Sequence, residues 1–265
     1  MRLDRLTLYL LIIYAALTAY TVATLVVPIP RIPASTIVLT LLAFTVMLLH
    51  AGQRLGWGRA GWLIALCFGI SLLFECVGVA TGLVYGPYHY TDSLGLKFLG
   101  LVPLLIPLAW FMMMYPSLVI AQGLTAWRPS KRSRILPILG VSALGGLIMT
   151  AWDLVMDPLM VKLGHWVWDG AASTRPYFGV PLQNYWGWWL TTFVIFAIFL
   201  SLAPRVGRGQ RADPPRPGFN RLALFGYLVT GLGSIGIAFL SGLEGPALVG
   251  LFAMAPWAWM AWQKL

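Results

Sequence analysis

Long apolar runs with almost no charge alternate with short polar loops, and they constrain the fold more than any other feature. Charged residues make up 10% of the 265 residues, against about 25% in an ordinary soluble domain. Runs long enough to span a bilayer occur at Leu6–Val27, Ala34–Leu49, Trp62–Val84, Phe98–Gln122, Ile135–Met156, Trp186–Ala203, Leu222–Leu240 and Pro246–Trp262. The sequence therefore predicts an all-α, polytopic transmembrane helix bundle of about eight spans. We expect residues 1–265 to form one integral membrane domain.

Basic residues predict how this bundle is oriented. With the N-terminus and every even-numbered loop on one side, that side holds fourteen of the eighteen Lys and Arg residues: Arg2, Arg5, Arg54, Arg59, Arg128, Lys131, Arg132, Arg134, Arg205, Arg208, Arg211, Arg216, Arg221 and Lys264. Cytoplasmic loops carry the excess of positive charge, so both termini are expected in the cytoplasm. The net charge of +10 then reflects loops beside anionic lipid and no nucleic-acid partner. The predicted location is the cell membrane, multi-pass.

The first apolar run also resembles a signal peptide, because it follows Arg2 and Arg5. Its length of about 22 residues exceeds that of a signal-peptide core and suits a membrane span. We therefore expect it to be a span. If this segment were cleaved as a signal peptide, seven membrane spans would remain.

Three acids, Glu75, Asp153 and Asp157, lie in or against apolar runs. An ionised carboxylate at the centre of a bilayer costs about 3 kcal/mol or more, so an intramembrane acid is a functional candidate. Ser71, Gly78 and Gly82 share the helix face of Glu75, which predicts close helix packing and an inward-facing carboxyl. Structural alternatives are a protonated Glu75 bonded between helices, and an Asp157 that ends its helix before Pro158.

Two long loops on the predicted outer side are rich in aromatic residues. They are Tyr85–Asp92 and Asp157–Tyr185, and they also carry the polar residues His89, Asp92, His165, Asp169 and Asn184. Trp and Tyr are common at membrane interfaces, but this mixture favours a lid or mouth over a pocket. The histidines and acids show no metal-ligand spacing, so no metal site is predicted. No phosphate-binding glycine motif or nucleophile elbow is found.

These motifs together resemble the integral membrane family of carotenoid biosynthesis that includes the carotenoid 1,2-hydratases. The matching pieces are Glu75, Gly82, Tyr85-Gly-Pro-Tyr-His-Tyr90, Val102-Pro103, Trp110, Asp153 to Asp157-Pro158, Gly164-His-Trp-Val-Trp168, Tyr177-Phe-Gly-Val-Pro181, Asn184 and Gly187-Trp188. The resemblance is strongest over residues 62–189, and the outer spans share only hydropathy. Phe178 stands where the pattern leads us to expect a second tyrosine, which implies a different substrate if that hydroxyl takes part in the chemistry.

The resemblance implies that water adds across the terminal C1–C2 double bond of an acyclic carotenoid ψ end group, with no cofactor. An acid must protonate C2, and water must then capture the tertiary cation at C1 while a base takes its proton. Glu75 lies deepest, so it is the expected acid. Asp153 is the expected residue that positions or deprotonates water, and Asp157 is expected to hold Asp153 or a water.

The expected partners are a carotenoid polyene, water, membrane lipid and other enzymes of the carotenoid pathway. A C40 polyene is about as long as the ~30 Å hydrocarbon layer is thick, so it is expected between helices with its end group near the outer interface. Aromatic faces can stabilise a cation, and Trp110, Trp166, Trp168 and Tyr177 are the candidates. The expected substrate-binding residues are Tyr88, His89, Tyr90, Trp110, Trp166, Trp168, Tyr177 and Asn184.

Three alternatives remain open at this point. Asp153-Leu-Val-Met-Asp157 resembles the Asp-x-x-x-Asp diphosphate motif of intramembrane lycopene- or prenyl-elongating transferases, although no second acidic cluster accompanies it. A carotene cyclase shares the protonation step but lets an internal alkene capture the cation. A non-catalytic carotenoid-binding or transport protein needs the acids only for packing or proton coupling.

Overall fold

The computed structural model describes residues 3–125, 135–170, 177–202 and 218–265. Within these ranges the chain forms eight α-helices, which confirms the all-α prediction, and each predicted segment overlaps one helix. They are α1 (Leu3–Ala23), α2 (Ser35–Leu55), α3 (Trp57–Thr81), α4 (Leu105–Leu124), α5 (Ile135–Lys162), α6 (Leu182–Leu202), α7 (Asn220–Leu240) and α8 (Glu244–Lys264).

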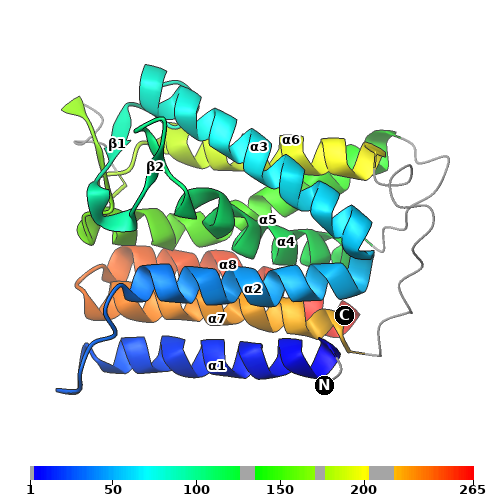
Figure 1. Cartoon of the computed structure of the whole chain (residues 1–265), viewed down its shortest axis with the longest axis horizontal. Helices are drawn as coiled ribbons and strands as arrows, with labels where there is room; N and C mark the ends of the chain where they lie inside the picture. Colours follow the sequence, from blue (N-terminus) through cyan, green and yellow to red (C-terminus); the bar gives the residue numbers. More distant parts are fainter. Residues whose placement is uncertain (1–2, 126–134, 171–176, 203–217) are drawn as a thin grey trace.

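Seven of these helices are long and apolar enough to cross a membrane, so the chain is a multi-pass membrane protein. The exception is α8, whose tryptophans, two prolines and Glu244 lower its mean hydropathy. Both termini lie at one end of the bundle (Figure 1), as an even number of antiparallel helices requires. Arg54 on α2 bonds to Asn220 at the start of α7, at that same end. Nine of the fourteen basic residues assigned to the cytoplasmic side, at positions 2, 128, 131, 132, 134, 205, 208, 211 and 216, lie outside the described residues, as does Arg175 of the other side.

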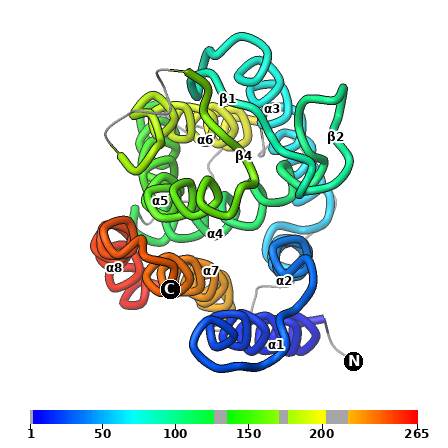
Figure 2. The backbone as a smooth tube through the Cα atoms, turned by 90° about the vertical axis from the view of Figure 1, so that its left-hand side faces the viewer, coloured from blue at the N-terminus to red at the C-terminus, as the bar shows by residue number. Residues whose placement is uncertain are grey.

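The bundle is built around α4, which contacts α2, α3, α5, α7 and α8. In α4, 89% of the most apolar stretch is buried, against 22% in α1. Figure 2 looks along the bundle from the end opposite the termini: α3, α4, α5 and α6 form one group, and α1, α2, α7 and α8 pack beside it.

A small hairpin replaces the predicted start of the fourth span. The apolar run beginning at Phe98 predicted a helix there, but β2 (Lys97–Phe98) pairs antiparallel with β3 (Val102–Pro103), and α4 begins only at Leu105. Leu99 and Gly100 have positive φ angles of 51° and 70°, which form a turn that a helix cannot contain. The predicted boundary was therefore wrong by seven residues.

Pro158 does not end the fifth helix, so the alternative reading of Asp157 as a helix terminator is wrong. The helix α5 continues to Lys162. Proline lacks the N–H that would bond to the carbonyl four residues earlier, here that of Leu154. The Tyr177 hydroxyl donates to this carbonyl oxygen at 2.8 Å. The freed backbone group is thereby satisfied by a neighbouring side chain, as required in a membrane helix.

The two aromatic loops pair with each other as a two-stranded sheet. β1 (Tyr88–Tyr90) runs antiparallel to β4 (Trp166–Trp168), with Tyr88 opposite Trp168 and Tyr90 opposite Trp166. Successive side chains of a strand point to opposite faces, so these four rings are buried while His89 and Val167 face outward. The sheet lies at the end of the bundle away from the termini (Figures 1 and 2).

Candidate active site

A pocket lies beneath the β1–β4 sheet, among α2, α3, α4, α5 and α6. Its volume is about 660 Å³, including its open mouth. Most of its wall is apolar or aromatic, and both Glu75 and Asp157 reach it. The lining residues are Thr36, Thr40, Glu75, Tyr85, Tyr88, Tyr90, Leu94, Leu105, Ile106, Ala109, Trp110, Met112, Trp152, Met156, Asp157, Met160, Trp166, Trp168, Asn184 and Trp188.

Glu75 is held by three side chains from two other elements and is only 3% exposed. Trp110 Nε1 of α4 donates to Oε1 at 2.9 Å. The hydroxyls of Tyr88 and Tyr90 both hydrogen-bond to Oε2, the latter at 2.8 Å. An indole N–H can only donate, whereas a phenol can donate or accept. Oε1 is therefore an acceptor, and Oε2, whose two partners can each donate or accept, is the oxygen of Glu75 that can carry a proton.

Ser71 and Gly78 share the inward face of Glu75 as predicted, whereas Gly82 follows the end of α3 with a positive φ of 71°. Ser71, Glu75 and Gly78 are buried on one face of α3. A Cβ added to Gly78 would lie 2.8 Å from Tyr85 Cδ2, and one added to Gly187 of α6 would lie 2.6 Å from Tyr85 Cδ1. The Tyr85 ring thus fills the space between α3 and α6, and the predicted direct helix approach at Gly78 is wrong.

Asp153 and Asp157 lie one helical turn apart on α5 and share Asn184 of α6 as a partner. Asn184 Nδ2 donates to Asp153 Oδ2 at 3.2 Å and also to Asp157 Oδ2. Asp157 lines the pocket. Asp153 is fully buried and does not line it, and its Oδ1 has no hydrogen-bond partner among the described residues. Two buried carboxylates this close repel each other, so the pair is expected to hold one proton between them.

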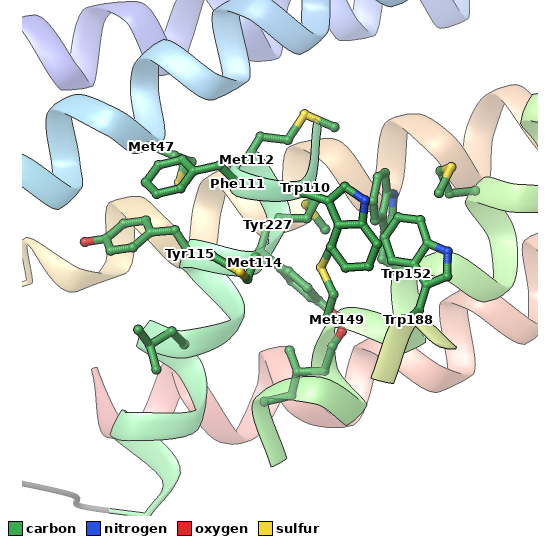
Figure 3. Close-up of a cluster of buried hydrophobic side chains, with 14 of the residues drawn as sticks. Met47, Trp110, Phe111, Met112, Met114, Tyr115, Met149, Trp152, Trp188 and Tyr227 are labelled. Atoms are coloured by element: carbon green, nitrogen blue, oxygen red, sulfur yellow. Dashed lines mark hydrogen bonds between the residues drawn. The ribbon is translucent and has the colours of Figure 1, made fainter. Parts of the chain in front are cut away.

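The pocket walls present several aromatic faces. Trp110 stacks on Trp188 with centroids 4.1 Å apart, and Trp152 meets Trp188 edge-on at 6.0 Å; Figure 3 shows these three rings grouped together. On the side of the sheet, Tyr88 packs on Trp168 and Tyr90 on Trp166, each at 5.6 Å. Such faces attract a cation, so the pocket is suited to an apolar molecule that becomes positively charged.

Six of the eight predicted substrate-binding residues line this pocket: Tyr88, Tyr90, Trp110, Trp166, Trp168 and Asn184. The other two, His89 and Tyr177, do not line it. His89 points outward from β1, and its Nδ1 lies 2.8 Å from Asp169 Oδ1 at the surface. Tyr177 contacts Leu154 and Tyr185 and is absent from the wall.

The outer acids and Phe178 also lie away from the pocket. Asp92 pairs with Lys97 at 2.7 Å, and the hydrogen bond and charge of Lys97 lower the pKa of Asp92. Phe178, which departs from the family pattern, is exposed and packs on Tyr177 and against Gly245. That departure therefore does not alter the pocket wall.

Several wall residues were not predicted from the sequence. They are Thr36, Thr40, Tyr85, Leu94, Leu105, Ile106, Ala109, Met112, Trp152, Met156, Met160 and Trp188. Trp152 directly precedes Asp153 and Trp188 lies one turn beyond Asn184, so helical spacing from the acids could have identified both. Thr36 and Thr40 lie on α2, outside the region of strongest resemblance, and nothing in their local sequence marks them.

His165 joins the sheet to α2. Its Nε2 lies 3.2 Å from Thr36 Oγ1 and its Nδ1 lies 2.7 Å from Ser93 Oγ. Partial burial lowers the pKa of His165, because desolvation disfavours the charged ring. A neutral imidazole therefore ties the loop that carries β4 to the helix that lines the pocket.

Protein stability is expected to fall on mild acidification because of His165. Its folded-state pKa lies below the unfolded value of about 6.5, so the unfolded state binds more protons and stability decreases as the pH is lowered through about 6.5. Thermal unfolding of the purified protein between pH 8 and pH 5 measures this. The His165→Gln variant should show a flatter profile, whereas His89→Gln, at an exposed site, should behave like the wild type. An unchanged profile in His165→Gln would contradict the assignment.

Comparison with known proteins identifies the family. The pattern of the carotenoid biosynthesis protein family matches residues 35–256. The chain belongs to this family. The match extends beyond residues 62–189 to include α2, α7 and much of α8, where only hydropathy had suggested kinship. All three candidate acids and every wall residue of the pocket fall inside it.

One curated relative also carries a functional name. The chain is 32% identical over 153 residues to a bisanhydrobacterioruberin hydratase of Haloarcula japonica. The aligned part covers 58% of this chain and 49% of the relative, so the chain matches about half of that protein's length. No solved structure gives a significant match.

Proposed function

We propose that this chain is a cofactor-independent carotenoid 1,2-hydratase of the cell membrane. The observation that carries the proposal is the placement of Glu75 and Asp157, from different helices, on one aromatic-walled pocket. The family supports a carotenoid substrate, and the name of the Haloarcula japonica relative supports hydration. Because that relative is matched over only about half its length, the reaction is a proposal for this chain.

The proposed reaction begins with proton transfer to the alkene. The proton on Glu75 Oε2 passes to C2 of the terminal double bond, and the π electrons form the new C–H bond. The tertiary cation at C1 is stabilised by the faces of tryptophans such as Trp110 and Trp188. Trp110 Nε1 and the two tyrosine hydroxyls bond to the Glu75 carboxylate that remains, which favours its formation.

The second step adds water and restores the acid. Water oxygen forms a bond to C1 while one water proton passes to Asp157, which lines the pocket. Asp153 lies behind Asp157 and shares Asn184 with it. We therefore assign the base to Asp157 and a positioning role to Asp153, the reverse of the roles expected from sequence. Return of the proton from Asp157 to Glu75 closes the cycle, so the net change is the addition of one water.

Pigment analysis in a carotenoid-producing host tests the proposal. A host that makes lycopene or γ-carotene should accumulate a carotenoid heavier by one water when it expresses this chain. Mass spectrometry distinguishes the alternatives, because a cyclase leaves the mass unchanged, a transferase adds isoprenoid carbons, and a binding protein alters no pigment. An unchanged mass would exclude the hydratase assignment for that substrate, and an acyclic carotenoid with a longer chain would then be tried in the same way.

A further inference from the structure

A second and larger pocket lies directly beside the candidate active site, among α1, α2, α5 and α7. Its volume is about 1040 Å³, including its mouth. Thr36, Thr40, Met112, Trp152 and Met160 line both pockets. The two spaces are therefore neighbours separated by a shared wall, and the two threonines are the hydroxyl residues of that wall.

Hydroxyl groups are frequent in the wall of the second pocket. Nine of its twenty lining residues are Ser, Thr or Tyr, and exposed Arg31, from the loop between α1 and α2, also lines it. Thr24 and Leu163 line this pocket and directly follow the ends of α1 and α5. The pocket therefore lies in the half of the bundle that carries the strands. Hydroxyl side chains are thus spread along this pocket from a loop arginine to the wall that it shares with the active site.

Thr40, on the wall that the two pockets share, has a hydroxyl without a partner in the described part of the chain. Thr40 is 6% exposed, and its hydroxyl makes no hydrogen bond within the described residues. Thr18 is 7% exposed, and its hydroxyl interacts with that of Tyr14, which is itself hydrogen-bonded to Thr230. Other helical threonines of this chain, such as Thr21 and Thr45, donate to the carbonyl one turn earlier. A hydroxyl without a partner in a largely buried side chain is unfavourable, so Thr40 indicates a polar molecule at this shared wall.

We propose that this second pocket holds the water consumed in the reaction and delivers it past Thr36 and Thr40 to the cation. The proposal rests on the hydratase function proposed above. Hydration requires a water next to the cation, which is expected against the tryptophan faces of the active-site pocket, and a water molecule needs two to four polar partners to be held in a protein. The hydroxyl-lined space can hold several waters at about 30 Å³ each. It can therefore store water directly beside the active-site pocket.

The chemistry separates water supply from protonation. If the cation at C1 forms but no water arrives, the cation loses a proton from C2 to the Glu75 carboxylate and the alkene is regenerated. In D₂O this return leaves deuterium on C2 of the recovered substrate. A chain with impaired water supply therefore continues to exchange hydrogen at C2 while it makes less tertiary alcohol.

The test compares hydration with deuterium exchange for purified protein and carotenoid in D₂O. Thr40→Val replaces the hydroxyl by a methyl group of the same shape, and it should lower hydration about tenfold while C2 exchange persists. Thr40→Ser keeps the hydroxyl and should restore hydration, and Thr18→Val should have a smaller effect. Thr45→Val, on the exposed face of the same helix, is the matched control and should equal the wild type.

The outcomes distinguish this proposal from the function on which it rests. A wild-type protein that neither hydrates nor exchanges would refute the hydratase function itself. If the wild type hydrates, the proposal that the second pocket supplies the water is refuted when the double variant Thr18→Val/Thr40→Val hydrates as fast as Thr45→Val. It is also refuted when hydration and exchange decrease together and Thr40→Ser rescues neither, because the defect is then structural. A lipid or polyene chain seated in this pocket in an experimental structure would refute it as well.

Discussion

Replacing Glu75 by glutamine is expected to abolish the hydrated carotenoid while the protein still inserts and folds. Glutamine keeps the side-chain shape, and its carbonyl oxygen can still accept from Trp110 Nε1. Its amide nitrogen can donate to the hydroxyls of Tyr88 and Tyr90, which are able to accept. What is lost is the transferable proton on Oε2. A general acid contributes about 10²–10⁴-fold to the rate, so product formation should fall by at least that factor.

The measurement is the yield of hydrated pigment in the carotenoid-producing host, normalised to the amount of protein in the membrane. Glu244→Gln is the matched control, because it makes the same substitution at an exposed glutamate at the start of α8. It should leave the yield unchanged. A normal yield from Glu75→Gln at a normal protein level would show that the proton comes from another group.

The helices and the inward placement of Glu75 could be predicted because both depend on short-range patterns. Apolar runs define the spans, and the spacing of Ser71, Glu75 and Gly78 defines one face of a helix. Asp153 and Asp157 were likewise placed on one face by their separation of four residues. Such arguments need only the geometry of a single helix, so no knowledge of the tertiary packing was required.

The features that were missed depend on contacts between distant segments. The β1–β4 pairing joins Tyr88–Tyr90 to Trp166–Trp168, and strands of three residues are too short to show a pattern of their own. This pairing determines that His89 faces outward. The role of Tyr177 depends on the carbonyl of Leu154 that Pro158 leaves free. Neither pair of partners is adjacent in the sequence.

The sequence could not predict which of the two aspartates reaches the pocket, because residue spacing defines a helix face but does not reveal what packs against it. Both Asp153 and Asp157 point to the same side of α5, and both bond to Asn184. Only the packing of α6 and of the sheet decides which carboxyl reaches the pocket. The sequence favoured Asp153 for handling water, whereas the pocket wall contains Asp157.

This difference gives the second major prediction: Asp157→Asn should reduce product about 10²–10⁴-fold, and Asp153→Asn should reduce it about tenfold. Asparagine retains an oxygen that can accept from Asn184 Nδ2 at either position, but it cannot accept the water proton at position 157. At position 153 it only alters the neighbour that holds Asp157 in place. Pigment yields of the two variants should be compared side by side in the same host.

Asp169→Asn is the matched control for this comparison, because Asp169 lies at the surface beside His89 and outside the pocket; its yield should equal that of the wild type. A greater loss in Asp153→Asn than in Asp157→Asn, with equal amounts of protein in the membrane, would return the water-handling role to Asp153. Because the two residues differ by one helical turn and share a partner, the ratio of their losses reports which carboxyl receives the water proton.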